Sequence, residues 1–174
     1  MELLSPAGHW DAMVAAVQNG ADAVYMGFGD YNARRGARNF SEEEYLAAVS
    51  YCHLRGVKVY LTLNTLLGDR ELDKAAELLR KASRMGVDAV IVQDWGVLSL
   101  CRQIVPDLPV HSSTQMTIHT RSGALEAARM GMQCAVLSRE LSEEEIRHIC
   151  TDSPIAIETF GHGAFACATP ASAL

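Results

Sequence analysis

Apolar residues come in short runs that alternate along the chain with longer segments of helical period. Most of the runs are continuously apolar, which is typical of strands buried on both faces. Strands are predicted at 2–6, 22–28, 57–64, 88–94, 109–116, 134–140 and 154–160. Helices are predicted at 9–20, 41–56, 69–86, 95–106, 120–131 and 142–152, several beginning at Ser or Asp and ending at Gly.

The passage from helix to strand repeats one pattern. "NGADAV" at 19–24 and "MGVDAV" at 85–90 each end a helix at Gly, turn at Asp and begin a strand at Ala-Val. Repetition of a βα unit predicts an α/β fold, a parallel (β/α)8 TIM-type barrel truncated after about seven strands and six helices. An open doubly wound sheet is the alternative, but no glycine-rich phosphate fingerprint follows the first strand. Unpaired backbone on the two outer strands would favour a homo-oligomer through the open barrel edge.

Composition predicts one soluble domain. The chain has 174 residues, of which 49% are hydrophobic and 21% charged, so it can bury a single core. A net charge of −6 argues against general attraction to nucleic acid or anionic membranes, although a local basic patch can exist within it. Five widely spaced cysteines favour a reducing compartment, and no apolar run approaches the roughly 20 residues of a membrane span. We therefore expect a cytoplasmic protein.

Polar residues at the predicted strand ends form the candidate site, because active sites of parallel barrels lie where the strands end. They are Ser5, Asn64, Gln93, Asp94, Ser113, Thr114, Gln115, Ser138, Arg139, Glu140, Glu158 and His162. From this set, Glu158, His162, Gln115 and Asn64 are the catalytic candidates, and Gln93, Ser113, Arg139 and Glu140 are candidates for substrate binding. The amides suit a planar polar ligand, and Arg139 beside Glu140 suits an anion or an ion pair. Any single member could instead be a structural cap.

Three arginines, Arg34, Arg35 and Arg38, lie in the segment "YNARRGARNF" that follows the second predicted strand. At the mouth of a barrel they could hold the phosphates of an RNA or nucleotide substrate. The alternative is a solvated surface loop that pairs with the acidic "SEEEY" directly after it.

No metal site is predicted from sequence. His111 and His119 have the wrong spacing for ligands on one helix face, and no paired carboxylate or cysteine stands near them in sequence, so we interpret His111 as a core or cap residue. Cys52, Cys101 and Cys150 lie in helical patterns and are expected to be buried. No G-x-S-x-G elbow supports a serine hydrolase.

Several segments taken together resemble the peptidase U32 family, the collagenase-like proteases. They are "ELLSPAG", "YCHLRGVKVYLTLNTL", "DAVIVQDWGVL", "VHSSTQMTIHT", "VLSRELS" and "ETFGHGA". The resemblance runs from Met1 to about Ala164 and implies an incomplete barrel domain over 1–164. It also implies either a peptidase or the activity of relatives that carry out oxygen-independent hydroxylation of rRNA, tRNA or ubiquinone precursors. Those relatives hold an iron–sulfur cluster through four cysteines.

The chain departs from the family pattern in residues 165–174, which we interpret as an aberrant tail. Ala166 stands where the family has its first cluster cysteine, Cys167 is one place late, and the Ser-Gly-x-Cys that follows in the family is absent. Back-translation from the third base of the Phe165 codon permits C-M-R-H-S-G-Q-C, the missing motif. We therefore hypothesise a frameshift near Ala164. The chain is expected to carry no cofactor by itself, and a 4Fe-4S cluster is implied for the intact protein.

Three functions remain open from the sequence. The family name implies a U32 peptidase, although the sequence shows neither an activated nucleophile nor a metal-bound water. The alternative is iron–sulfur-dependent hydroxylation of tRNA, rRNA or a ubiquinone precursor in the intact protein. A noncatalytic scaffold that binds a partner at the open barrel edge is the third. Peptide or RNA is the expected substrate, and this chain alone is expected to be inactive.

Overall fold

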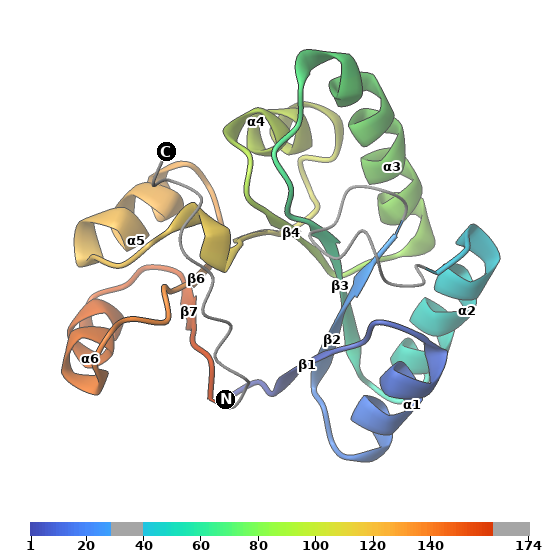
Figure 1. The fold of residues 1–174 in the computed structure, drawn as a ribbon, viewed down its shortest axis with the longest axis horizontal. Helices are drawn as coiled ribbons and strands as arrows, with labels where there is room; N and C mark the ends of the chain where they lie inside the picture. The colour runs from blue at the N-terminus through green and yellow to red at the C-terminus, as the bar shows by residue number, and fades with distance from the viewer. Residues whose placement is uncertain (29–39, 162–174) are drawn as a thin grey trace.

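The computed structural model describes residues 1–28 and 40–161 (Figure 1). Its strands form one parallel sheet in which each strand pairs with its neighbours in chain order. The strands are β1 (Leu4–Pro6), β2 (Ala23–Gly27), β3 (Lys58–Leu63), β4 (Ala89–Val92), β5 (Val110–Ser112), β6 (Cys134–Val136) and β7 (Ala156–Glu158). The predicted α/β fold with seven parallel strands is confirmed.

Helices follow the strands one by one and ring the outside of the curled sheet (Figure 1). The α-helices are α1 (Trp10–Gln18), α2 (Glu42–His53), α3 (Leu72–Met85), α4 (Trp95–Ile104), α5 (Arg121–Arg129) and α6 (Glu143–Thr151). Two 3-10 turns, η1 (Asp69–Glu71) and η2 (Thr114–Met116), precede α3 and follow β5. In the described part of the chain no strand pairs with the outer edge of β1 or of β7, so the sheet is an open half-barrel.

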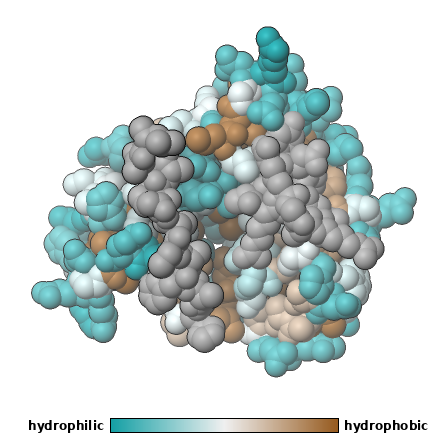
Figure 2. All heavy atoms as spheres, in the orientation of Figure 1, coloured by the Kyte–Doolittle hydropathy of each residue, from teal (hydrophilic) through white to brown (hydrophobic). Residues whose placement is uncertain are grey.

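The core lies mainly between the sheet and the helices. On β3, Val59, Leu61 and Leu63 belong to a large buried cluster that also contains residues of the helices, such as Leu79. The alternate residue Tyr60 belongs to a separate small cluster made only of strand residues, which is the inner face of the barrel. Because β3 is buried on both faces from Val59 to Leu63, apolar residues there occupy both faces rather than alternating with exposed polar ones. Hydrophilic residues make up most of the outer rim (Figure 2).

Side chains just before three strands fix the register of the sheet. Each accepts a hydrogen bond from a backbone N–H at the beginning of the preceding strand, and we call these contacts the strand anchors. They join Asp22 to Leu3, Asp88 to Val59 and Gln133 to Val110, each at 2.7 Å. A glycine with positive φ precedes each anchor by two residues and ends the helix before it, with φ of 90° at Gly20, 81° at Gly86 and 80° at Gly131. The repeated Gly-x-Asp pattern therefore has a structural role, and Gln133 fills it in the third copy.

All seven strands are shorter than predicted, and the largest differences are at the ends of β5 and β6. The segment 109–116 is a strand only to Ser112, because Ser113 accepts a hydrogen bond from the Gln115 N–H and begins η2, which ends at Thr117 with φ of 58°. The segment 134–140 is a strand only to Val136. These boundaries were predicted wrongly because a short apolar run does not reveal where a side chain takes over a backbone hydrogen bond.

Cysteine burial agrees with the sequence at two of three helical positions. Cys52 and Cys101 are buried in the core, but Cys150 on α6 is exposed, so its predicted burial is wrong. Residues 151 and 152 beside it are exposed too, whereas Ile149 in the same turn is buried in the core. No helix among the described residues is long and apolar enough to cross a membrane.

Candidate functional site

The predicted strand-end residues gather at one end of the sheet because the strands are parallel. Asn64 and Gln93 follow β3 and β4 directly and are half-buried. Ser113 follows β5 and is buried, and Glu158 is the last residue of β7. The structure therefore brings part of the predicted set to the barrel mouth, with Glu158 half-buried at its open side.

Other members of the set cap helical turns or are exposed. Asp94 caps α4 by accepting from the Val97 N–H at 3.1 Å. Ser113 caps η2, and Gln115 within that turn is exposed. Arg139 is exposed and lies over the ring of Phe160 at 4.1 Å. Glu140 is exposed beside it. Asp94 and Ser113 thus act as caps, and a role of any of these residues in substrate binding stays a prediction.

Four predicted residues lie outside the described part of the chain. These are Arg34, Arg35, Arg38 and His162. Their proposed roles in phosphate binding and catalysis remain predictions.

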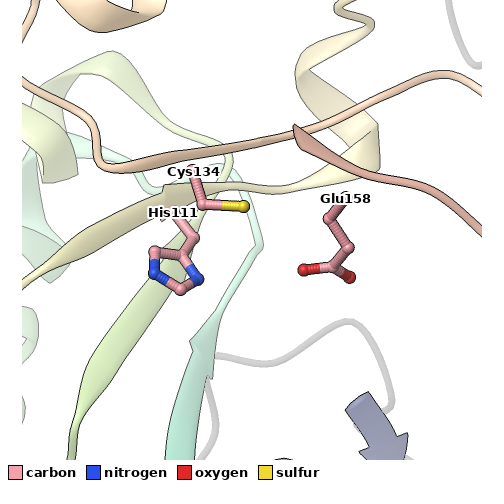
Figure 3. A group of neighbouring side chains, drawn as sticks. All are labelled: His111, Cys134 and Glu158. Atoms are coloured by element: carbon pink, nitrogen blue, oxygen red, sulfur yellow. The ribbon is translucent and has the colours of Figure 1, made fainter. Parts of the chain in front are cut away.

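A cluster that the sequence did not reveal lies on the inner face of β5, β6 and β7. His111, Cys134 and Glu158 each offer a ligand atom, and these three atoms lie within 4.8 Å of one another. Their side chains point toward a common space inside the barrel (Figure 3). His111 on β5 pairs directly with Cys134 on β6. Glu158 lies on β7, the other neighbour of β6, and pairs there with Val136. We call this group the interior cluster.

The three residues were missed because they are remote from one another in sequence. The prediction against a metal site considered only neighbours of His111 along the chain, whereas the fold supplies neighbours from the next two strands. Aligning the predicted strands in parallel register would have placed His111 beside Cys134, and that alignment was the available signal.

Burial drives each group of the interior cluster toward its neutral form. Burial raises the pKa of Glu158 to about 7, and the charge of Glu2 adds to the rise. Burial lowers the pKa of His111 to about 4. Burial also raises the pKa of the Cys134 thiol to about 12, with Glu158 and Glu2 contributing. At neutral pH the metal-free cluster therefore holds a neutral imidazole, a thiol and a carboxyl group that is partly protonated.

A chain of contacts reaches the imidazole from β3, two strands away in the sheet. The ring of Tyr60 meets the ring of His111 edge-on, with 4.9 Å between centroids. The Tyr60 hydroxyl donates to Glu2 at 2.5 Å, and the Lys58 ammonium also donates to Glu2 at 2.8 Å. Burial opposes ionisation of Glu2, but the hydrogen bonds from Lys58 and Tyr60 outweigh it and lower its pKa. The interior cluster thus faces a carboxylate that stays ionised.

The described cysteines do not fit a 4Fe-4S cluster, which needs four cysteine ligands. Cys52 and Cys101 are buried in the core between the helices and the sheet, and Cys150 is exposed on α6. Within residues 1–28 and 40–161, the one group of side chains with metal-ligand spacing contains a single cysteine. No chemical step is therefore assigned to such a cluster.

Sequence comparison identifies relatives with two kinds of names. The profile of peptidase family U32 matches residues 8–170. A 23S rRNA 5-hydroxycytidine synthase of Escherichia coli is 42% identical over 166 residues, which cover 94% of this chain and 24% of that protein. A tRNA hydroxylation protein of Bacillus subtilis is 35% identical, covering 94% and 39% of the two chains. A collagenase of Porphyromonas gingivalis is 32% identical, covering 94% and 42%.

Structural comparison confirms the fold. A solved U32 peptidase superposes with a TM-score of 0.75 at 18% identity, covering 91% of this chain and 68% of that one. At this identity the likeness concerns the fold alone. The chain spans between 24% and 42% of the length of the three relatives named above.

Proposed function

The chain belongs to peptidase family U32, and from that premise we propose that it forms the barrel domain of an enzyme that hydroxylates RNA. The observation that carries the proposal is the order of similarity. The rRNA hydroxycytidine synthase is 42% identical to this chain and the collagenase 32%, at the same coverage of this chain.

The interior cluster supports this proposal over proteolysis. A cysteine peptidase needs a thiolate, which a neighbouring imidazolium stabilises. Cys134 does lie near His111 and Glu158, and this is the observation that favours a peptidase. However, burial raises the pKa of Cys134 to about 12 and lowers that of His111 to about 4, the reverse of what an activated nucleophile requires.

In the proposed enzyme, the barrel mouth receives a flipped-out or single-stranded base. RNA bases are bound in this way, by hydrogen bonds to their edges. Asn64 and Gln93, half-buried after β3 and β4, are the proposed contacts for those edges. Glu158 is the proposed group for proton exchange with the base, because burial raises its pKa to about 7 and it can both donate and accept near neutral pH. Arg34, Arg35 and Arg38 are the proposed phosphate contacts.

The test is nucleoside analysis of RNA from cells. The complete gene product is expressed in an Escherichia coli strain that lacks its 23S rRNA 5-hydroxycytidine synthase, and rRNA and tRNA are digested and measured by mass spectrometry. We expect a pyrimidine nucleoside heavier by one oxygen. Glu158→Gln should reduce its amount at least about 10-fold, within the range for a proton-transfer group, whereas Cys150→Ser on the outer surface should not.

A peptidase would give the opposite result in these two assays. Cleavage of gelatin by the purified protein, with no oxygen-containing nucleoside formed, would overturn the proposal. A noncatalytic scaffold would yield neither product. Substitution of the three arginines by Ala should reduce RNA affinity and flatten its dependence on salt, by about 0.7 in slope for each phosphate of single-stranded RNA that an arginine no longer neutralises.

A further inference from the structure

We propose that the interior cluster of His111, Cys134 and Glu158 is a binding site for a divalent transition-metal ion of the zinc type. The three ligand atoms already lie within 4.8 Å of one another and face a common space (Figure 3). This inference goes beyond the proposed RNA hydroxylation, since it concerns what these three side chains bind and not which substrate the enzyme modifies, and the two proposals share only Glu158.

The donor set selects the class of metal. One imidazole nitrogen, one thiolate and one carboxylate oxygen suit Zn²⁺, which binds them at about 2.0–2.3 Å. Mg²⁺ and Ca²⁺ prefer oxygen ligands only and are disfavoured by the thiol. Three protein ligands leave a position for water, as in catalytic zinc sites. Bound Zn²⁺ with a thiolate and a carboxylate has no net charge, which lowers the free-energy cost of burying the whole group.

A second observation also points to a ligand. The Nδ1 atom of His111 is buried and has no hydrogen-bond partner in the described part of the chain. A buried polar atom without a partner is destabilising and is rare in native proteins. Coordination of the ion by this nitrogen would remove the cost, as would a hydrogen bond from it to metal-bound water. The ring is also held in place by Tyr60, so little ordering is needed when it binds.

The scaffold places the ligands on rigid elements. His111, Cys134 and Glu158 come from three consecutive parallel strands. The Ser112 hydroxyl accepts a hydrogen bond from the Val136 N–H at 3.0 Å, which ties β5 to β6 beside the cluster. Sites built on strands hold ligand geometry better than sites on loops. The Glu2 carboxylate, bonded to Tyr60 and Lys58, adds negative charge that favours a cation.

Binding of the ion changes the role of Glu158. As a ligand, Glu158 is ionised and no longer carries the proton that it holds in the metal-free protein. Water on the open coordination position would then be the group with a pKa near neutrality.

Metal titration tests the proposal directly. The reduced, chelator-treated protein is titrated with Co²⁺ and then with Zn²⁺ and followed by absorption. We expect one equivalent of Co²⁺ to produce a thiolate-to-metal charge-transfer band and intense d–d bands, which Zn²⁺ then abolishes because it binds more tightly. Zn²⁺ at about 100 times its Kd should raise Tm by about 5–10 °C.

Matched variants locate the ion. Cys134→Ser should abolish the charge-transfer band, and His111→Gln or Glu158→Gln should weaken Co²⁺ binding at least about 100-fold, beyond the effect of groups that only support ligands. Cys150→Ser removes an exposed thiol outside the cluster and should leave the titration unchanged.

The result that would overturn the proposal is equally specific. Binding without a charge-transfer band, or binding that Cys150→Ser abolishes and Cys134→Ser does not, excludes the interior cluster. If Cys134→Ser fails to fold, X-ray absorption of the unsubstituted protein with Zn²⁺ decides the matter. One sulfur neighbour with nitrogen or oxygen neighbours supports the site, and no sulfur neighbour refutes it.

Discussion

The half of the sheet built from β2, β3 and β4 differs from the half built from β5, β6 and β7. Strands β2, β3 and β4 have 5, 6 and 4 residues, and β5, β6 and β7 have 3 each. The inner face of the first half is closed by Ala23, Tyr60, Ala89 and Ile91. The inner face of the second half carries His111, Cys134 and Glu158 instead.

The two halves of the sheet therefore differ in role, one packing the interior and the other carrying titratable groups. The first half satisfies its backbone in long ladders and fills its interior with apolar side chains, which stabilises the fold. The second half buries titratable groups whose pKa values are displaced from their ordinary range. Groups of this kind gather at functional sites more often than elsewhere. The two halves should therefore respond differently to matched substitutions.

The largest contrast is expected from two leucines. Leu61 on β3 and Leu137 after β6 are both buried in the main core. Leu61→Ala should lower the free energy of unfolding by about 4 kcal/mol, because long strands on either side prevent collapse of the cavity, and Leu137→Ala by about 2–3 kcal/mol. Urea unfolding of both variants measures the difference. An equal or larger loss for Leu137→Ala would break the comparison.

A smaller effect is expected from two glycines with positive φ. Gly20 has φ of 90° and open space around an added Cβ, whereas Gly131 has φ of 80° and its Cβ would lie 2.7 Å from the Arg102 guanidinium. Gly20→Ala should cost about 1 kcal/mol and Gly131→Ala about 1 kcal/mol more. Among residues 1–28 and 40–161 the buried Nε and Nη2 atoms of Arg102 have no hydrogen-bond partner, so the expected extra cost for Gly131→Ala is steric. Equal losses in thermal unfolding would show that Arg102 relaxes without cost.

The pH dependence of stability should differ between the protein and Glu158→Gln. Burial raises the pKa of Glu158 from 4.5 to about 7, so the folded state binds more protons than the unfolded state between these values. Stability is therefore lost as pH rises through this window. Burial lowers the pKa of His111 from 6.5 to about 4, which makes stability rise with pH over that range.

Because His111 is present in both proteins, the difference between their Tm values at each pH reports on Glu158 alone. With a chelator present, the Tm of Glu158→Gln relative to the unsubstituted protein should increase by about 5–10 °C from about pH 4.5 to about pH 7. If the Tm of both proteins changed equally with pH, the result would contradict the burial of this carboxyl group.

The smallest effect is expected at Glu2, the residue that links the two halves. Its ion pair with Lys58 is partly exposed, so Glu2→Gln should change the free energy of unfolding by less than about 1 kcal/mol. The same change removes a negative charge that helps to raise the pKa of Glu158. The pKa of Glu158, measured by NMR titration, should therefore fall. An unchanged value would show that the two carboxyl groups are not coupled.

The fold could be predicted from sequence because its signals are local. Continuous apolar runs mark strands covered on both faces, and the Gly-x-Asp pattern marks their beginnings. The end of β5 could not be predicted, since Ser113 competes with the sheet through its side chain. Glu158 was identified from its position at a strand end. His111 and Cys134 were not, because their proximity depends on pairing between strands and not on any sequence neighbour.

The strand anchors have a consequence for the order in which the chain is made. Asp22 binds the segment of β1, Asp88 binds β3, and Gln133 binds β5, each of which precedes its anchor in synthesis. Each anchor therefore finds its partner already outside the ribosome when it emerges. Sheet register can be set one unit at a time during translation, and a growing chain need not wait for its last strand before its first strands are correctly aligned.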